Sequence, residues 1–172
     1  MGMRKTVVLM ASMVLVTLLA SGVAWAAISC HAGTGCRGDG GNNVMFGSQG
    51  RDTMKGRGGH DSMSGEAGSD KMYGGLGNEK YMFGGTGDDL IEGNAGSDYL
   101  YGDEGADRVR GGLGTDTVDG WYGPDRLFGG DGGDTIDTGW RDGRHDYVDC
   151  GAGFDTVFSN SNDTVRNCER RY

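Results

Sequence analysis

The chain has 172 residues, of which 25 are Asp or Glu and 16 are Lys or Arg, so its net charge is −9. This balance argues against a surface that binds nucleic acid or anionic lipid, because like charges would repel. The 37 glycines and the single proline are typical of a disordered chain. However, the apolar residues recur in step with the glycines, so we expect an ordered fold.

Residues 1–26 have the three parts of a secretory signal peptide. Arg4 and Lys5 precede the apolar run TVVLMASMVLVTLLA, and the tripeptide AWA forms a small–x–small cleavage pattern. We expect cleavage after Ala26 and a secreted, extracellular mature chain with 14 basic (16 − 2) and 25 acidic residues, a net charge of −11. The alternative is an uncleaved membrane anchor; no later stretch is apolar enough to span a membrane.

From residue 38 to residue 137 the chain consists of eleven consecutive units with one pattern. Ten units have nine residues and the fifth has ten: GDGGNNVMF, GSQGRDTMK, GRGGHDSMS, GEAGSDKMY, GGLGNEKYMF, GGTGDDLIE, GNAGSDYLY, GDEGADRVR, GGLGTDTVD, GWYGPDRLF and GGDGGDTID. Glycine occupies places one and four of all eleven, and aspartate occupies place six of nine, with Asn43 and Glu79 in the other two. Place eight holds Met45, Met54, Met63, Met72, Tyr81, Ile91, Leu100, Val109, Val118, Leu127 and Ile136.

The two parts of each unit have different expected conformations. Places one to five require sharp reversals with positive φ, which glycine adopts without a steric penalty. Places seven to nine should form a three-residue strand with one buried side chain. Because one apolar residue cannot build a core, two units should form an 18-residue coil, and coils should stack about 4.8 Å apart. The expected fold class is therefore all-β: a parallel β-roll (β-solenoid) with two short-stranded parallel sheets.

This stacking places the place-six carboxylates of units 18 residues apart over one another. A single such aspartate could be an ordinary turn residue, but stacked carboxylates repel unless a cation lies between them. The glycine turns add backbone carbonyl oxygens, and the pattern contains no thiolate or imidazole. An oxygen-only site suits calcium far better than zinc or copper.

The units match GGxGxDx-aliphatic-x and resemble the RTX (haemolysin-type) calcium-binding nonapeptide-repeat family. The resemblance covers about residues 38–137 and implies a parallel β-roll in which the first six residues of each unit bind calcium. Most RTX proteins carry the repeats beside a toxin, protease or lipase domain, for which this chain has no room, so we do not expect those activities here. The resemblance predicts these metal ligands, the last two in decayed units: Asp52, Asp61, Asp70, Asp89, Asp98, Asp107, Asp116, Asp125, Asp134, Asp146 and Asp155.

We expect regular and distorted calcium sites. Asp61 faces Glu79, and Asp70 faces Asp89 across the extra residue of the fifth unit, so these two sites should be weaker. Several calcium ions would neutralise most of the negative charge. We therefore expect the calcium-free chain to be expanded and to fold when calcium binds, with an affinity of about 10⁻⁴–10⁻³ M. The expected regular pairs are Asp52–Asp70, Asp89–Asp107, Asp98–Asp116, Asp107–Asp125 and Asp116–Asp134.

The four cysteines lie at the two ends of the expected roll. Residues 27–37 should form an N-terminal cap closed by Cys30–Cys36, and residues 138–172, where the pattern slips, should form irregular final coils and a C-terminal cap. Cys150 and Cys168 are one coil apart and should pair, whereas a distance of roughly 26 Å between the ends excludes cross-end disulfides. A lipidated Cys30 remains the alternative, because AISC weakly resembles a lipoprotein cleavage site.

Places seven and nine should point outward, and successive units should alternate between the sheets. On one sheet this rule makes Lys80 and Met82 the outward residues of the fifth unit. The other sheet should carry a basic surface beside Tyr73 and Phe128, which could bind an acidic polysaccharide or a cell-envelope component; a merely solvated face is the alternative. Its basic residues are Lys55, Lys71, Arg108, Arg110 and Arg126.

The pattern favours a non-enzymatic calcium-binding module with a structural, adhesive or envelope-associated role. The alternative is a polysaccharide-acting enzyme or an accessory module of one, built on a solenoid. An enzyme would require acid and base groups clustered on one sheet face, and the outward residues of neither sheet show such a cluster.

Overall fold

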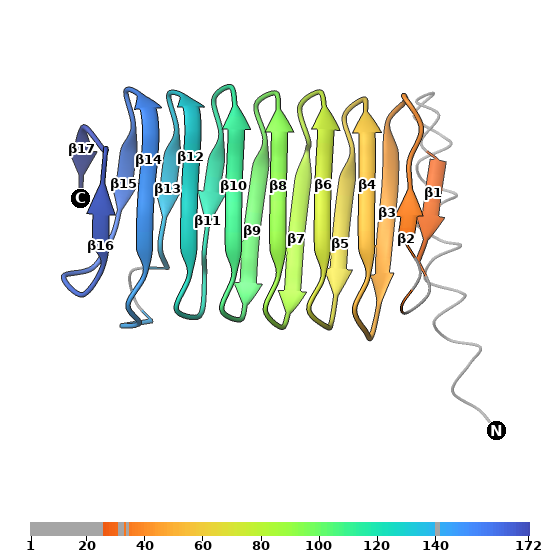
Figure 1. The fold of residues 1–172 in the computed structure, drawn as a ribbon, viewed down its shortest axis with the longest axis horizontal. Helices are drawn as coiled ribbons and strands as arrows, with labels where there is room; N and C mark the ends of the chain where they lie inside the picture. The colour runs from red at the N-terminus through yellow and green to blue at the C-terminus, as the bar shows by residue number, and fades with distance from the viewer. Residues whose placement is uncertain (1–25, 31–32, 34, 140–141) are drawn as a thin grey trace.

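The computed structural model describes residues 26–30, 33, 35–139 and 142–172; residues 1–25, which hold the expected signal peptide, lie outside the described residues. The described chain forms a β-solenoid in which successive strands alternate between two parallel sheets, so that the termini lie at opposite ends (Figure 1). In the same part of the chain there is no helix long and apolar enough to cross a membrane.

Each sheet takes every second strand of the chain. The nine-stranded sheet A consists of β1 (Ala26–Ser29), β3 (Asn43–Ser48), β5 (Ser62–Glu66), β7 (Tyr81–Thr86), β9 (Tyr99–Glu104), β11 (Thr117–Asp119), β13 (Thr135–Asp137), β15 (Thr156–Phe158) and β17 (Arg170–Arg171). The eight-stranded sheet B consists of β2 (Gly35–Arg37), β4 (Thr53–Gly58), β6 (Lys71–Leu76), β8 (Leu90–Ala95), β10 (Arg108–Leu113), β12 (Arg126–Gly132), β14 (Tyr147–Gly153) and β16 (Thr164–Arg166). The expected parallel two-sheet β-roll is confirmed.

The core is a double column of one side chain per unit, enclosed between the sheets. Strand pairs are in register 18 residues apart, as in Val109↔Leu127 and Leu100↔Val118. These side chains are almost completely buried and alternate with outward neighbours, which is the period-two pattern of a strand. The members of the column are Met45, Met54, Met63, Met72, Met82, Ile91, Leu100, Val109, Val118, Leu127, Ile136, Val148 and Val157.

Most strands are longer than the three residues that the repeat predicts. Strand β8, for example, continues through Gly93, Asn94 and Ala95, the first three places of the next unit. The expectation of positive φ throughout places one to five was therefore wrong: only places two and four take it regularly. Place two does so even without glycine, as at Arg57, Glu66 and Asn94.

The extra residue of the fifth unit lies in the turn. The pairs Ser62↔Tyr81 and Met63↔Met82 show that the strand register resumes one residue later than the pattern suggested. Met82 is therefore in the core and Tyr81 is exposed. The assignment of Tyr81 to the core, and of Lys80 and Met82 to the outer face, was wrong, because a turn accommodates an inserted residue at less cost than a paired strand.

Both expected disulfides are present at the ends. Cys30 is bonded to Cys36, with a Cα–Cα distance of 5.5 Å. Cys150 is bonded to Cys168, with a Cα–Cα distance of 5.2 Å. The sheets also extend beyond residues 38–137: β1 and β2 pair with β3 and β4, and β14 to β17 continue both sheets.

Candidate metal sites

The eleven aspartates predicted as metal ligands all lie at the inner side of the turns. Each has at most 3% of its surface exposed, and Asn43 and Glu79, which replace aspartate at place six, are buried as well. Carboxylates are rarely buried to this degree without a partner. Their burial follows from the glycine turn, which bends the chain so that place six points into the coil immediately before the strand begins.

One oxygen of almost every place-six carboxylate is held by the backbone of the preceding coil. The Asp107 Oδ1 atom accepts a hydrogen bond of 2.8 Å from the Asp89 N–H, and the Asp125 Oδ1 atom accepts one of 2.8 Å from the Asp107 N–H. The same bond, 2.7–2.9 Å long, recurs between further coils. Residues 18 apart are therefore joined by a ladder that runs along each row of turns.

The other oxygen has no partner within the described residues. Such buried, unpartnered oxygens occur on all eleven predicted aspartates and on Glu79, and in nearly every aspartate the atom is Oδ2. An unpaired buried acceptor costs about 1–3 kcal/mol, and more when it is charged. A column of such atoms requires either protons or cations.

The place-one glycines make room for these oxygens. A Cβ atom on Gly111 would overlap Asp116 Oδ2 and the carbonyl oxygen of Gly129, and one on Gly93 would overlap Asp98 Oδ2. A carboxylate oxygen and a backbone carbonyl oxygen from the next coil therefore converge on the space above the same glycine Cα. This is the oxygen donor set that calcium prefers, and a methyl group would fill it.

Burial also shifts the protonation of the carboxylates. It raises the pKa of Asp107 to about 8 and the pKa values of Asp89, Asp116 and Asp125 to about 7, with backbone hydrogen bonds opposing the shift. Repulsion by the neighbouring place-six carboxylate adds to the increase. Near neutral pH these turns therefore favour a bound positive charge.

The two pairs expected to be distorted differ from each other. Asp70 donates its N–H to Asp89 Oδ1 at 2.7 Å, as in regular coils, so the expected distortion of this pair is absent. At the other pair, both carboxylate oxygens of Glu79 are buried and unpartnered. Burial and the adjacent Asp98 carboxylate raise the pKa of Glu79. The irregularity is thus confined to the row of turns that contains Glu79.

Protein donors replace the missing partner near the ends of the ladder. Ser48 donates its N–H and its hydroxyl to Asp52 Oδ2, at 2.7 and 2.8 Å. At the other end, Asp163 Oδ1 accepts from the Asp146 N–H and Asp163 Oδ2 accepts from the Thr138 hydroxyl at 2.9 Å. The sequence reading missed Asp163, although the remnant NDTV, which aligns an aspartate with place six, could have indicated it.

No group of three or more His, Cys, Asp or Glu side chains able to hold a metal ion occurs in the part of the chain that the structure describes. A cation in these turns would therefore be held by one or two carboxylates together with backbone oxygens, as the glycine geometry indicates.

The chain matches the family model of the RTX calcium-binding nonapeptide repeat over residues 46–78, 83–118 and 111–140. These segments cover more than half of the sequence and coincide with the regular ladder. The chain belongs to the RTX calcium-binding repeat family. A comparison of the chain with curated proteins found no match. The RTX repeats account for the recurring glycine cradle and for the place-six carboxylates, and the family is one that binds calcium.

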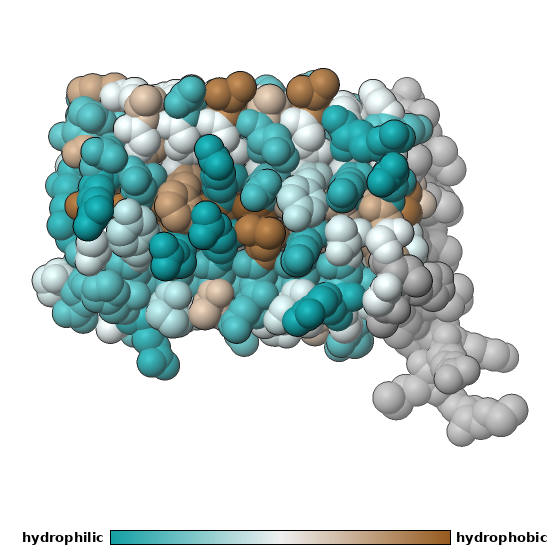
Figure 2. Space-filling model, in the orientation of Figure 1, coloured by the Kyte–Doolittle hydropathy of each residue, from teal (hydrophilic) through white to brown (hydrophobic). Residues whose placement is uncertain are grey.

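The outer face of sheet B carries the expected basic residues. Lys55 lies 5.3 Å from the ring centroid of Tyr73, and Arg108 lies 4.9 Å from that of Phe128. Arg126 similarly lies over the ring of Tyr147. Figure 2 shows this face as largely hydrophilic, with a few hydrophobic side chains among the polar ones. The basic and aromatic residues are thus brought together as the repeat predicted.

The outer face of sheet A differs because of the register shift at β7. Tyr81 and Phe83 join Tyr99 and Tyr101 in a cluster of four aromatic rings. The closest pair, Phe83 and Tyr101, has ring centroids 4.9 Å apart. The sequence analysis did not find this cluster, because it assigned Tyr81 to the core.

Proposed function

We propose that this RTX chain is a secreted protein whose turns bind several calcium ions and which folds when they bind. The observation that carries the proposal is the column of buried carboxylate oxygens that lack a protein partner. The proposed ligands are the Asp52, Asp61, Asp70, Asp89, Asp98, Asp107, Asp116, Asp125, Asp134, Asp146 and Asp155 carboxylates together with glycine carbonyl oxygens. Binding would neutralise charges that otherwise repel one another along the ladder.

The proposed role is structural: an adhesive or envelope-associated module without catalysis. Both disulfides suit an oxidising compartment outside the cytosol. The buried carboxylates are held in the turns by backbone hydrogen bonds, where they have no access to a substrate. We therefore favour this role over an enzyme that acts on polysaccharides.

Calcium titration of the purified mature chain, followed by far-ultraviolet circular dichroism, tests the proposal. We expect little β signal in excess chelator at neutral pH, a cooperative gain near about 10⁻⁴–10⁻³ M calcium, and a much smaller effect of magnesium. Full β structure in chelator at pH 7.5 would show that calcium does not drive folding.

We further propose that the basic face of sheet B binds an acidic polysaccharide or an acidic envelope component through Lys55, Lys71, Arg108, Arg110 and Arg126. Five cations and adjacent aromatic rings on one face of an acidic protein support this partner. The triple variant Arg108→Ala/Arg110→Ala/Arg126→Ala should lose retention on an acidic glycan in calcium while keeping its calcium-induced dichroism. Unchanged retention would exclude this face as the binding surface.

A further inference from the structure

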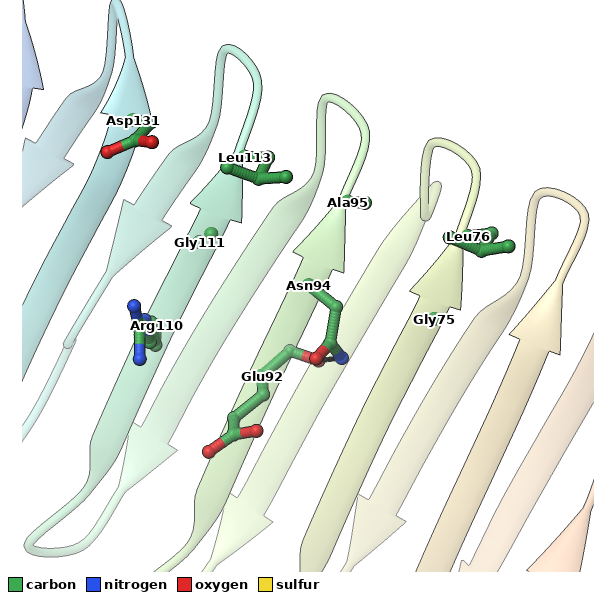
Figure 3. Close-up of a pocket in the computed structure, with 10 residues that line it drawn as sticks. Gly75, Leu76, Glu92, Asn94, Ala95, Arg110, Gly111, Leu113 and Asp131 are labelled. Atoms are coloured by element: carbon green, nitrogen blue, oxygen red, sulfur yellow. Dashed lines mark hydrogen bonds between the residues drawn. The ribbon is translucent and has the colours of Figure 1, made fainter.

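Sheet B carries a groove of about 400 Å³ beside the basic residues. Its floor includes Gly75, Gly111 and Gly112, and its polar wall includes Glu92, Asn94 and Arg110. Figure 3 shows Leu76, Ala95 and Leu113 at the ends of β6, β8 and β10, on the opposite side of the groove. The groove is open and does not include any of the buried place-six carboxylates among its lining residues.

The groove exists because place two of several coils has no side chain. Gly112, Gly130 and Gly151 are paired in register on β10, β12 and β14, and Gly75 occupies the same place on β6. The bare glycine row runs across the strands, parallel to the long axis of the solenoid. Place nine and place three form its two walls, about 10 Å apart at 3.3 Å per residue. This shape fits an extended polymer that crosses several strands.

Arg110 differs from the other arginines of this face. Arg108 and Arg126 lie over the rings of Phe128 and Tyr147. Arg110 is exposed, lines the groove, and has no hydrogen bond, ion pair or ring contact with any residue that the structure describes. Its guanidinium group is therefore free to bind a planar anion in a bidentate manner.

The remaining lining residues suit a sugar ring. Leu76 and Leu113 are 70% and 58% exposed, so they offer apolar contact to the C–H face of a pyranose. Asn94, whose Nδ2 donates to the Glu92 carbonyl oxygen at 3.1 Å, and the Glu92 and Asp131 carboxylates can bind hydroxyl groups. The two carboxylates would repel a densely anionic polymer such as nucleic acid. The lining thus favours a ligand with both carboxylates and many hydroxyl groups.

We propose that this groove is a binding subsite for a linear uronic-acid polysaccharide, with Arg110 binding a sugar carboxylate and the glycine row seating the chain along the solenoid axis. The inference rests on the proposed polysaccharide-binding role of sheet B, and it assigns one residue and one direction to that role.

Calorimetric titration of the calcium-loaded protein with tetragalacturonate, and with maltotetraose as the neutral probe, tests the subsite. Arg110→Gln should weaken tetragalacturonate binding by about tenfold or more. Lys71→Gln removes the same charge from the same face outside the groove and should weaken binding by no more than about fivefold. Ala95→Phe changes no charge but fills the groove, and it should weaken binding as much as Arg110→Gln.

The outcomes separate the two proposals. If the wild type binds tetragalacturonate but Arg110→Gln behaves like Lys71→Gln and Ala95→Phe has no effect, the groove assignment is wrong and general binding by sheet B survives. If the wild type binds neither oligosaccharide, both the partner and the subsite are wrong, while calcium-driven folding remains tested by dichroism. If Ala95→Phe instead changes the molar mass in light scattering and leaves glycan binding intact, the groove is a contact between copies of the chain.

Discussion

Residues 38–83 and residues 84–137 form the same coils with different cores. In the first segment the buried column consists of five methionines, whereas in the second it consists of isoleucine, leucine and valine. The strands nevertheless pair in the same parallel register, and the carboxylate-to-backbone bonds have similar lengths, 2.7 Å at Asp52 and 2.8 Å at Asp107. The coil is therefore determined by the glycine and aspartate frame, and the core only has to be apolar and of suitable volume.

The two segments differ more in their need for cations. The first contains Asn43 and Glu79 at place six, and Ser48 supplies a protein partner to Asp52. In the second every place six is aspartate, and burial raises the pKa of Asp89 to about 7 and that of Asp107 to about 8. This difference teaches that one backbone frame can hold carboxylates with unequal demand for a counter-charge.

The largest effect should come from breaking the frame that the two segments share. In Gly111→Ala the added methyl group would overlap Asp116 Oδ2 and a backbone carbonyl oxygen. We expect a loss of about 2 kcal/mol or more in the free energy of unfolding with calcium bound. Gly40→Ala is the matched control, since no atom lies within 4 Å of its Cβ position. Equal midpoints of urea denaturation in calcium for both variants would contradict the proposed cradle.

The next effect should distinguish the segments. Asp107→Asn should lower the calcium stoichiometry and the Tm in calcium by more than Asp52→Asn, because Ser48 already satisfies one oxygen of Asp52. In chelator the sign should reverse, since the amide removes a buried negative charge. Differential scanning calorimetry with and without calcium measures both effects, and a loss of Tm by Asp107→Asn under both conditions would contradict a cation-binding role.

The pH dependence should also reverse with calcium. The raised pKa values mean that the folded state binds more protons than the unfolded chain between about pH 4 and the folded values of about 7–8. In chelator the stability should therefore be fully present below about pH 4 and be lost as the pH rises through 7–8. Calcium affinity should increase over the same window. Circular dichroism from pH 4 to 8 in chelator checks this, and a β signal that grows with pH would have the wrong sign.

The smallest effect should come from exchanging core residues between the segments. Met82 and Leu100 are paired neighbours in sheet A, so Met82→Leu and Leu100→Met each conserve volume and should cost less than about 1.5 kcal/mol. Chemical denaturation in saturating calcium measures the change. A larger loss in either variant would show that core identity, and not only the turn frame, determines the coil.

The repeat was sufficient to predict the two parallel sheets, both disulfides and the burial of all eleven aspartates, because each depends on a period of 18 residues. It was not sufficient to place the extra residue of the fifth unit. The four preceding units have methionine at place eight, and this signal could have identified Met82 rather than Tyr81 as the core residue. The aromatic cluster of sheet A was missed for the same reason.

Other features could not be found by pattern alone. The positive φ at Arg57 and Asn94 is imposed by the coil, against the preference of those residue types. The partners of Asp52 and Asp163 depend on Ser48 and Thr138, which lie outside the repeat pattern. Such contacts arise only where the ladder ends, because a coil at the end has no neighbour to continue it.

The most direct measurement is an anomalous difference map from crystals of the mature chain grown in calcium. We expect peaks along both rows of turns, about 2.3–2.6 Å from the buried Oδ2 atoms and the glycine carbonyl oxygens. The row from Asp89 to Asp146 should show them most completely. A map without peaks at those oxygens, with the carboxylates protonated or hydrated instead, would contradict calcium binding in the turns.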